Sequence, residues 1–114
     1  MLVEDDADTR ELLVKVLRDA GHPVVTADDG QQAMDLLEKG IRPCIVIVDL
    51  ALPHVSGGEL LKYMQSDPDF RTIPAIVVSG LPRERINVVA DAVLLKPCEP
   101  QTLLDTIRRF TGTS

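Results

Sequence analysis

Four short apolar runs in this chain are each followed directly by polar residues. Glu4, Asp5 and Asp6 follow the apolar residues at the beginning of the chain, and Asp49 ends the run at 44–48. Ser79 follows the run at 75–78, and Lys96 follows the run at 92–95. If the fold brought these carboxylates, the hydroxyl and the ammonium group together, they could bind a cation and phosphate oxygens.

The acidic side chains would repel one another if they converged without a cation. Carboxylates at contact distance raise one another's pKa, whereas a small hard cation lets several of them stay ionised. The ligand set is oxygen only, because the sequence has no cysteine or histidine cluster. Such a set favours Mg²⁺, which keeps several waters and is usually held by one or two carboxylates together with phosphate oxygens.

The apolar runs alternate with segments of helical spacing, which predicts alternating strands and helices. We predict strands at 1–3, 24–27, 44–48, 75–78 and 92–95. Helices should begin at Asp6 or Asp8, near Asp28, and at 57, 82 and 100. The first helix should bury an apolar face that includes Leu12 and Leu17.

Five strands that are each followed by a helix imply a parallel sheet with right-handed crossovers and helices on both faces. In such sheets the ligand site lies beyond the carboxyl ends of the strands, where the strand order reverses. The polar residues named above all follow predicted strands, so we expect them to meet at that edge.

Several short motifs together resemble the signature of response-regulator receiver domains. They are Glu4–Asp5–Asp6, Asp49-Leu50-Ala51-Leu52-Pro53 with Gly57 four residues beyond, Ser79–Gly80 and Lys96–Pro97. The match covers essentially the whole chain. The resemblance implies a flavodoxin-like (CheY-like) doubly wound sheet of five parallel strands in the order 2-1-3-4-5. It also implies one receiver domain over 1–114, with no output domain in the chain.

The resemblance implies a role for each polar residue near the phosphoryl group. Asp49 would be the phosphoacceptor, whose carboxylate attacks a phosphoryl group in line and becomes an aspartyl phosphate. Lys96 would pair with the phosphoryl oxygens, and Ser79 would donate a hydrogen bond to one of them. A cis Lys96–Pro97 peptide bond is also expected by analogy.

The resemblance also implies Mg²⁺ as the cofactor. Asp5 and Asp49 would bind the ion with their carboxylates, Glu4 would bind it through water, and Ala51 would bind it through its backbone carbonyl.

The main hypothesis is a phosphoacceptor module of two-component signalling rather than an enzyme that acts on metabolites. Its phosphoryl donor would be a histidine kinase or a histidine phosphotransfer protein. The sequence identifies no downstream effector, and it is compatible with a homodimer. One alternative is a degenerate receiver that serves only as a protein-interaction or dimerisation platform. Another is an aspartyl-phosphate hydrolase, but that pattern has a second aspartate where this chain has Ala51.

The composition argues against several other classes of protein. Apolar residues make up 45% and charged residues 26%, as in an ordinary globular domain, and the net charge of −6 argues against direct nucleic-acid binding. No apolar run approaches the roughly 18 residues of a membrane-spanning helix, so we expect a cytoplasmic protein. Cys44 and Cys98 belong to no metal or redox motif, and we interpret both as reduced thiols with packing roles.

The switch should differ from the family pattern. Val93 stands three residues before Lys96, where many members carry an aromatic residue that turns inward on activation. A branched aliphatic side chain has few rotamers and little reach. We therefore expect the backbone from Ser79 to Arg83 to move instead.

Two elements are shorter than the family pattern. The segment 81–90 leaves room for a fourth helix of about two turns. The first strand has only the residues 1–3 before Glu4, although central strands usually run to about five or six residues. This suggests either that upstream residues are missing or that the chain was cut from a longer protein.

Overall fold

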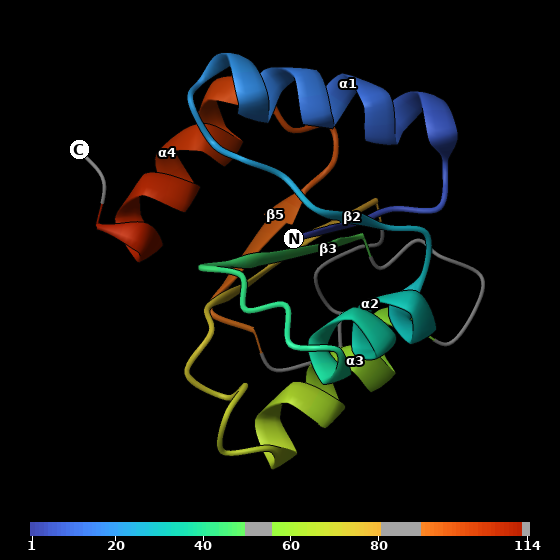
Figure 1. Ribbon diagram of the computed structural model, residues 1–114. Helices are drawn as coiled ribbons and strands as arrows, with labels where there is room; N and C mark the ends of the chain where they lie inside the picture. Colours follow the sequence, from blue (N-terminus) through green and yellow to red (C-terminus); the bar gives the residue numbers. More distant parts are fainter. Residues whose placement is uncertain (50–55, 81–89, 113–114) are drawn as a thin grey trace.

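The computed structural model describes residues 1–49, 56–80 and 90–112, and at 56 and 57 it describes the backbone alone. Within these ranges the chain forms one parallel sheet in the order β2-β1-β3-β4-β5 (Figure 1). The strands are β1 (Leu2–Val3), β2 (Thr26–Ala27), β3 (Val46–Asp49), β4 (Ala75–Ser79) and β5 (Ala92–Leu95). The predicted fold class and strand order are confirmed.

The described helices cover both faces of the sheet, as Figure 1 shows. They are α1 (Ala7–Asp19), α2 (Gly30–Glu38), α3 (Ser56–Ser66) and α4 (Pro100–Thr111). Leu17 of α1 and Leu103 of α4 belong to one apolar cluster, and Leu37 of α2 and Leu60 of α3 belong to another. None of these helices is both long and apolar enough to cross a membrane. The predicted helix at 82–89 lies outside the described residues.

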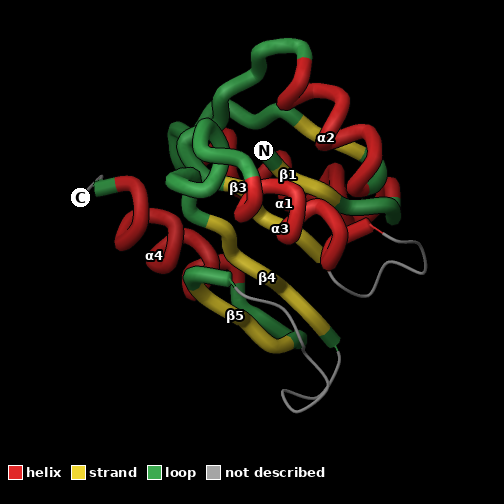
Figure 2. Tube along the Cα trace, turned by 90° about the horizontal axis from the view of Figure 1, so that it is seen from below, coloured by secondary structure: helices red, strands yellow, loops and turns green. Residues whose placement is uncertain are grey.

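The central strands β3 and β4 bury both of their faces. Val46 and Val48 pack in the cluster under α2 and α3, whereas Ile47 packs in the cluster under α1 and α4. Side chains alternate between the two faces of a strand, so a strand covered on both sides needs an apolar residue at every position. Figure 2 shows β4 beside β5 in the view from below.

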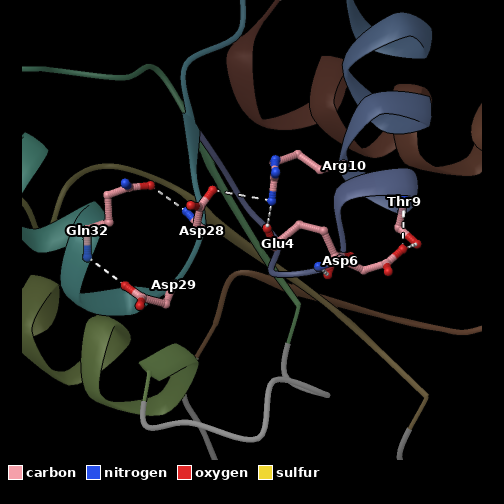
Figure 3. Close-up of polar contacts among 7 residues, drawn as sticks. All are labelled: Glu4, Asp6, Thr9, Arg10, Asp28, Asp29 and Gln32. Carbon is pink, nitrogen blue, oxygen red and sulfur yellow. Dashed lines mark hydrogen bonds and ion pairs between the residues drawn. The ribbon is translucent and has the colours of Figure 1, made fainter.

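Two of the helices begin at aspartate caps near the carboxyl ends of β1 and β2 (Figure 3). Asp6 caps α1 by accepting a hydrogen bond of 2.8 Å from the Thr9 amide, and Asp8 lies inside the first turn. Asp29 caps α2 in the same way, with the Gln32 amide at 2.8 Å. The caps fix where the chain turns from each strand into its helix.

Two predictions of buried residues are wrong. Leu12 is 61% exposed, because Leu13 and Leu17 occupy the stripe of α1 that packs against the sheet. Cys44 is exposed, because β3 begins at Val46 rather than at residue 44. Leu12 lies next to the partly buried Leu13 and Cys44 lies next to the buried Ile45, and periodicity alone does not place such a boundary.

Candidate functional site

The carboxyl ends of four strands carry the polar residues singled out in the sequence. Glu4 directly follows β1, Asp49 ends β3, Ser79 ends β4, and Lys96 directly follows β5. The residues that precede Glu4 and Asp49 are paired in the sheet, which puts the two acids level with each other. Ser79 is paired with the residue that precedes Lys96. The parallel register therefore gathers these residues at one edge.

One ion pair crosses this edge from β5 to β3. Lys96 Nζ lies 2.5 Å from Asp49 Oδ2, and the Asp49 side chain is only 8% exposed. The backbone positions the lysine, because Lys96 N donates a hydrogen bond of 2.7 Å to Ser79 O. The Lys96–Pro97 peptide bond is cis, as predicted. The buried carboxylate at the end of β3 is thus paired with an ammonium group that reaches across β4 from the end of β5.

Glu4 is a second buried carboxylate at the site. The residue is 2% exposed, and Glu4 Oε2 accepts a hydrogen bond of 3.3 Å from the Asp6 amide. Burial, followed by the hydrogen bond and the negative charge of Asp49, raises the pKa of Glu4 to about 7. The Asp6 amide and Lys96 lower this pKa but do not offset the rise. Glu4 and Asp49 therefore repel each other when both are ionised.

The other predicted metal ligands are placed differently. Asp5 is exposed, and Ala51 lies outside the described residues. Over the described ranges, no three acidic, histidine or cysteine side chains come together as a ready-made metal site. Among the acidic side chains, it is Asp49 whose proximity raises the pKa of Glu4.

The donor set is nevertheless one that suits Mg²⁺. Magnesium keeps several waters and is usually held by one or two carboxylates, so it does not need a complete cage of side chains. The carboxylates of Glu4 and Asp49 offer oxygen atoms and repel each other when both are ionised, and a nearby cation would let both stay ionised.

Arg10 lies beside the acidic residues, although nothing in the sequence analysis singled it out. Arg10 Nη1 donates a hydrogen bond of 2.9 Å to Glu4 O and lies 3.3 Å from Asp28 Oδ1 (Figure 3). A signal was present in the sequence, because Arg10 is the only basic residue among five acidic ones at 4–11. Its place one helical turn after Asp6 directs it back toward the end of β1.

Comparison of the sequence with known families and proteins gives a single answer. Residues 1–108 match the model of the response regulator receiver domain. The chain is 30% identical to the polar-differentiation response regulator DivK of Brucella anthropi, over 98% of this chain and 94% of that protein.

Solved structures agree with the family match. The signal receiver domain of a signal transduction histidine kinase from Syntrophus aciditrophicus superposes with a TM-score of 0.90 at 28% identity, over 97% of this chain and 87% of that one. The receiver domain of a sensor histidine kinase from Pseudomonas aeruginosa has a magnesium ion coordinated in its active site cleft. It superposes with a TM-score of 0.87 at 25% identity, over 98% of this chain and 95% of that one. Together with the strand order, these matches show that the chain belongs to the response-regulator receiver family.

Proposed function

We propose that the chain is a phosphoacceptor that takes a phosphoryl group on Asp49 from a histidine kinase or a histidine phosphotransfer protein. The observation that carries this proposal is the contact of 2.5 Å between Lys96 Nζ and Asp49 Oδ2. This buried carboxylate lies at the carboxyl edge of a doubly wound sheet, where such folds bind their ligands.

The Asp49 carboxylate acts as the nucleophile. A bond forms between an Asp49 oxygen and the phosphorus of a phosphohistidine, while the bond from phosphorus to the imidazole nitrogen breaks. The electron pair of the broken bond stays on that nitrogen. Lys96, already beside Asp49, then pairs with the new phosphoryl oxygens, and the Ser79 hydroxyl donates a hydrogen bond to one of them.

Mg²⁺ would be held by the carboxylates of Asp5 and Asp49, by the carbonyl of Ala51 and, through water, by Glu4. When bound, the ion neutralises charge on the phosphoryl oxygens during transfer. The mutual repulsion of Glu4 and Asp49 supports a cation at this place. The magnesium ion in the cleft of the Pseudomonas aeruginosa receiver supports it as well.

The output of the domain should not depend on an aromatic switch. Val93 packs against the apolar cluster under α2 and α3, and its branched side chain has few rotamers. We expect the backbone from Ser79 to Arg83 to carry the change to an effector, although residues 81–83 lie outside the described residues. In keeping with the proposed partner, we place the chain in the cytoplasm.

Intact-mass spectrometry after incubation with acetyl phosphate tests the proposal. With Mg²⁺ present, the natural chain should gain one acid-labile phosphoryl group, and in EDTA it should gain none. The Asp49→Asn variant should gain none in either buffer, because it lacks the nucleophile.

Asp69→Asn is the matched control, because it makes the same change at an exposed residue outside the site. It should gain the phosphoryl group as the natural chain does. Equal phosphorylation of Asp49→Asn would move the acceptor elsewhere. No phosphorylation of the folded natural chain would favour the alternative, a degenerate receiver that serves as an interaction platform.

A further inference from the structure

Arg10 joins three parts of the fold at the edge of the site (Figure 3). It lies in the first turns of α1, donates from Nη1 to Glu4 O at 2.9 Å, and approaches Asp28 Oδ1 at 3.3 Å. Its side chain is 22% exposed, so most of it is packed against the protein. Neither of its two contacts is with a carboxylate of a proposed metal ligand.

The bond from Arg10 fixes the peptide group that leads into Asp5. Glu4 N donates a hydrogen bond of 3.0 Å to Ala27 O, so the peptide group before Glu4 is held by β2. Glu4 O is held by Arg10. Because a peptide group is planar, holding Glu4 O also sets the orientation of the Asp5 amide. Both peptide groups around Glu4 are therefore fixed, and with them the direction in which the chain leaves β1.

Asp28 orients the guanidinium group from the far side. The Asp28 amide donates to Gln32 Oε1 at 2.5 Å, and the neighbouring Asp29 caps α2. Both contacts fix the backbone at Asp28 relative to the first turn of α2. A planar guanidinium group with two partners in different directions has little freedom to turn toward the acids.

We propose that Arg10, oriented by Asp28, is a positioning residue that holds the Glu4–Asp5 peptide in place for cation binding. The inference rests on the proposed function, because it assigns Asp5 and Glu4 to the Mg²⁺ site. Groups that orient metal ligands without touching the metal commonly change its affinity about tenfold or more when they are removed.

The sign of the change in Mg²⁺ affinity distinguishes this role from others. Arg10→Gln removes a positive charge beside an acidic site, so electrostatics alone would strengthen Mg²⁺ binding. A merely structural role would lower the stability of the domain and leave the Mg²⁺ affinity of the folded protein unchanged. Positioning instead predicts that Mg²⁺ binds about tenfold more weakly to Arg10→Gln.

Titration of the ¹⁵N-labelled full chain with MgCl₂, followed by amide chemical shifts, measures the affinity and shows that each variant is folded. Arg18→Gln is the matched control, because it removes the same charge from an exposed position in the last turn of α1. It should bind Mg²⁺ as the natural chain does. In EDTA, ¹⁵N relaxation should show faster internal motion of residues 4–6 in Arg10→Gln only.

A double-mutant cycle keeps the test usable if Arg10→Gln folds poorly. Asp28→Asn should weaken Mg²⁺ binding in the natural background, and Arg10→Lys should weaken it less than Arg10→Gln. In an Arg10→Lys background, the effect of Asp28→Asn should shrink, because the two residues act through one contact. Full additivity, or an unchanged or tighter Mg²⁺ affinity of folded Arg10→Gln, would overturn the inference.

The failure of this inference can be told apart from failure of the proposed function. If the natural chain neither binds Mg²⁺ nor gains a phosphoryl group, the proposed function fails. If the natural chain does both and folded Arg10→Gln binds Mg²⁺ equally well, only the role of Arg10 fails.

Discussion

The two ends of the sheet use their acidic residues differently. At the amino end, Asp91 Oδ2 accepts a hydrogen bond of 2.7 Å from the Ala75 amide, and the Asp91 amide donates one of 2.9 Å to Ala75 O. At the carboxyl end, Glu4 and Asp49 are both buried and each disfavours the charge of the other, and Lys96 is paired with Asp49. The hydrogen bonds of Asp91 stabilise the folded chain, whereas the repulsion between Glu4 and Asp49 destabilises it.

The destabilising pair of acids at the carboxyl end of the sheet indicates a binding site. A carboxylate that meets a backbone donor stabilises the folded chain, whereas a buried carboxylate that meets another one destabilises it. Groups with a perturbed pKa in such a place are typical of binding and catalytic sites. The repulsion between Glu4 and Asp49 therefore fits a site that is completed by a cation.

The largest effect on stability is expected at the amino end. Asp91→Ala removes the acceptor of the buried Ala75 amide and should lower the free energy of unfolding by about 1–2 kcal/mol. Asp91→Asn keeps an acceptor oxygen and should cost less. Urea denaturation in EDTA measures both changes. An Asp91→Ala midpoint equal to that of the natural chain would show that the carboxylate at the amino end does not stabilise the fold.

The opposite sign is expected at the carboxyl end. Glu4→Gln removes one of two repelling carboxylates and should raise the free energy of unfolding by about 1 kcal/mol in EDTA at pH 7.5. This is less than the full pKa shift would give, because Lys96 and solvent screen the pair. If Glu4→Gln unfolds at lower urea than the natural chain, the two acids do not oppose folding.

The advantage of Glu4→Gln should depend on pH. The pKa of Glu4 is raised in the folded chain, from 4.5 to about 7. Between these values the folded state holds the proton that the unfolded state has lost, so the natural chain loses stability as pH rises from 4.5 to 7. The variant does not share this loss, so its advantage should vanish below pH 4.5 and level off above pH 7.

The quantity to measure is the difference in the free energy of unfolding between Glu4→Gln and the natural chain at each pH. Burial lowers the pKa of the Met1 amino group to about 6, which gives both chains extra stability as pH rises through 6 to 8. Subtracting one urea series from the other cancels this contribution. An advantage that is equally large at pH 4.5 and pH 7.5 would show that repulsion is not its cause.

The smallest effect is expected at Asp5. Because Asp5 is exposed, Asp5→Asn should change the free energy of unfolding in EDTA by less than about 0.5 kcal/mol. The same variant should nevertheless weaken Mg²⁺ binding, because Asp5 is a proposed direct ligand. A change in stability as large as that of Glu4→Gln would place Asp5 inside the repelling pair.

Much of the fold could be predicted from the sequence, for a physical reason. β3 and β4 are apolar at every position before their last residues, Asp49 and Ser79, and only a strand covered on both faces requires such a run. Polar residues directly after such strands had to meet at one edge. The positions of Glu4, Asp49, Ser79 and Lys96 follow from this, while their roles in phosphoryl transfer stay predictions.

The rest depends on contacts that a pattern does not encode. Glu4 and Asp5 are consecutive acids, and the turn from β1 into α1 decides which one is buried. Arg10 gains its place only because Glu4 O and Asp28 come within its reach. Leu12 looks like a core residue in the sequence, yet one position of rotation around α1 leaves it exposed.

The central claim is that Asp49 carries the phosphoryl group, and trapping the acyl phosphate tests it most directly. The natural chain is incubated with acetyl phosphate and Mg²⁺, reduced with borohydride, digested and sequenced by tandem mass spectrometry. Reduction of an aspartyl phosphate leaves homoserine in its place. We expect homoserine at position 49 alone, and none without Mg²⁺. Homoserine at position 5, or at any other acidic residue with none at 49, would contradict the account.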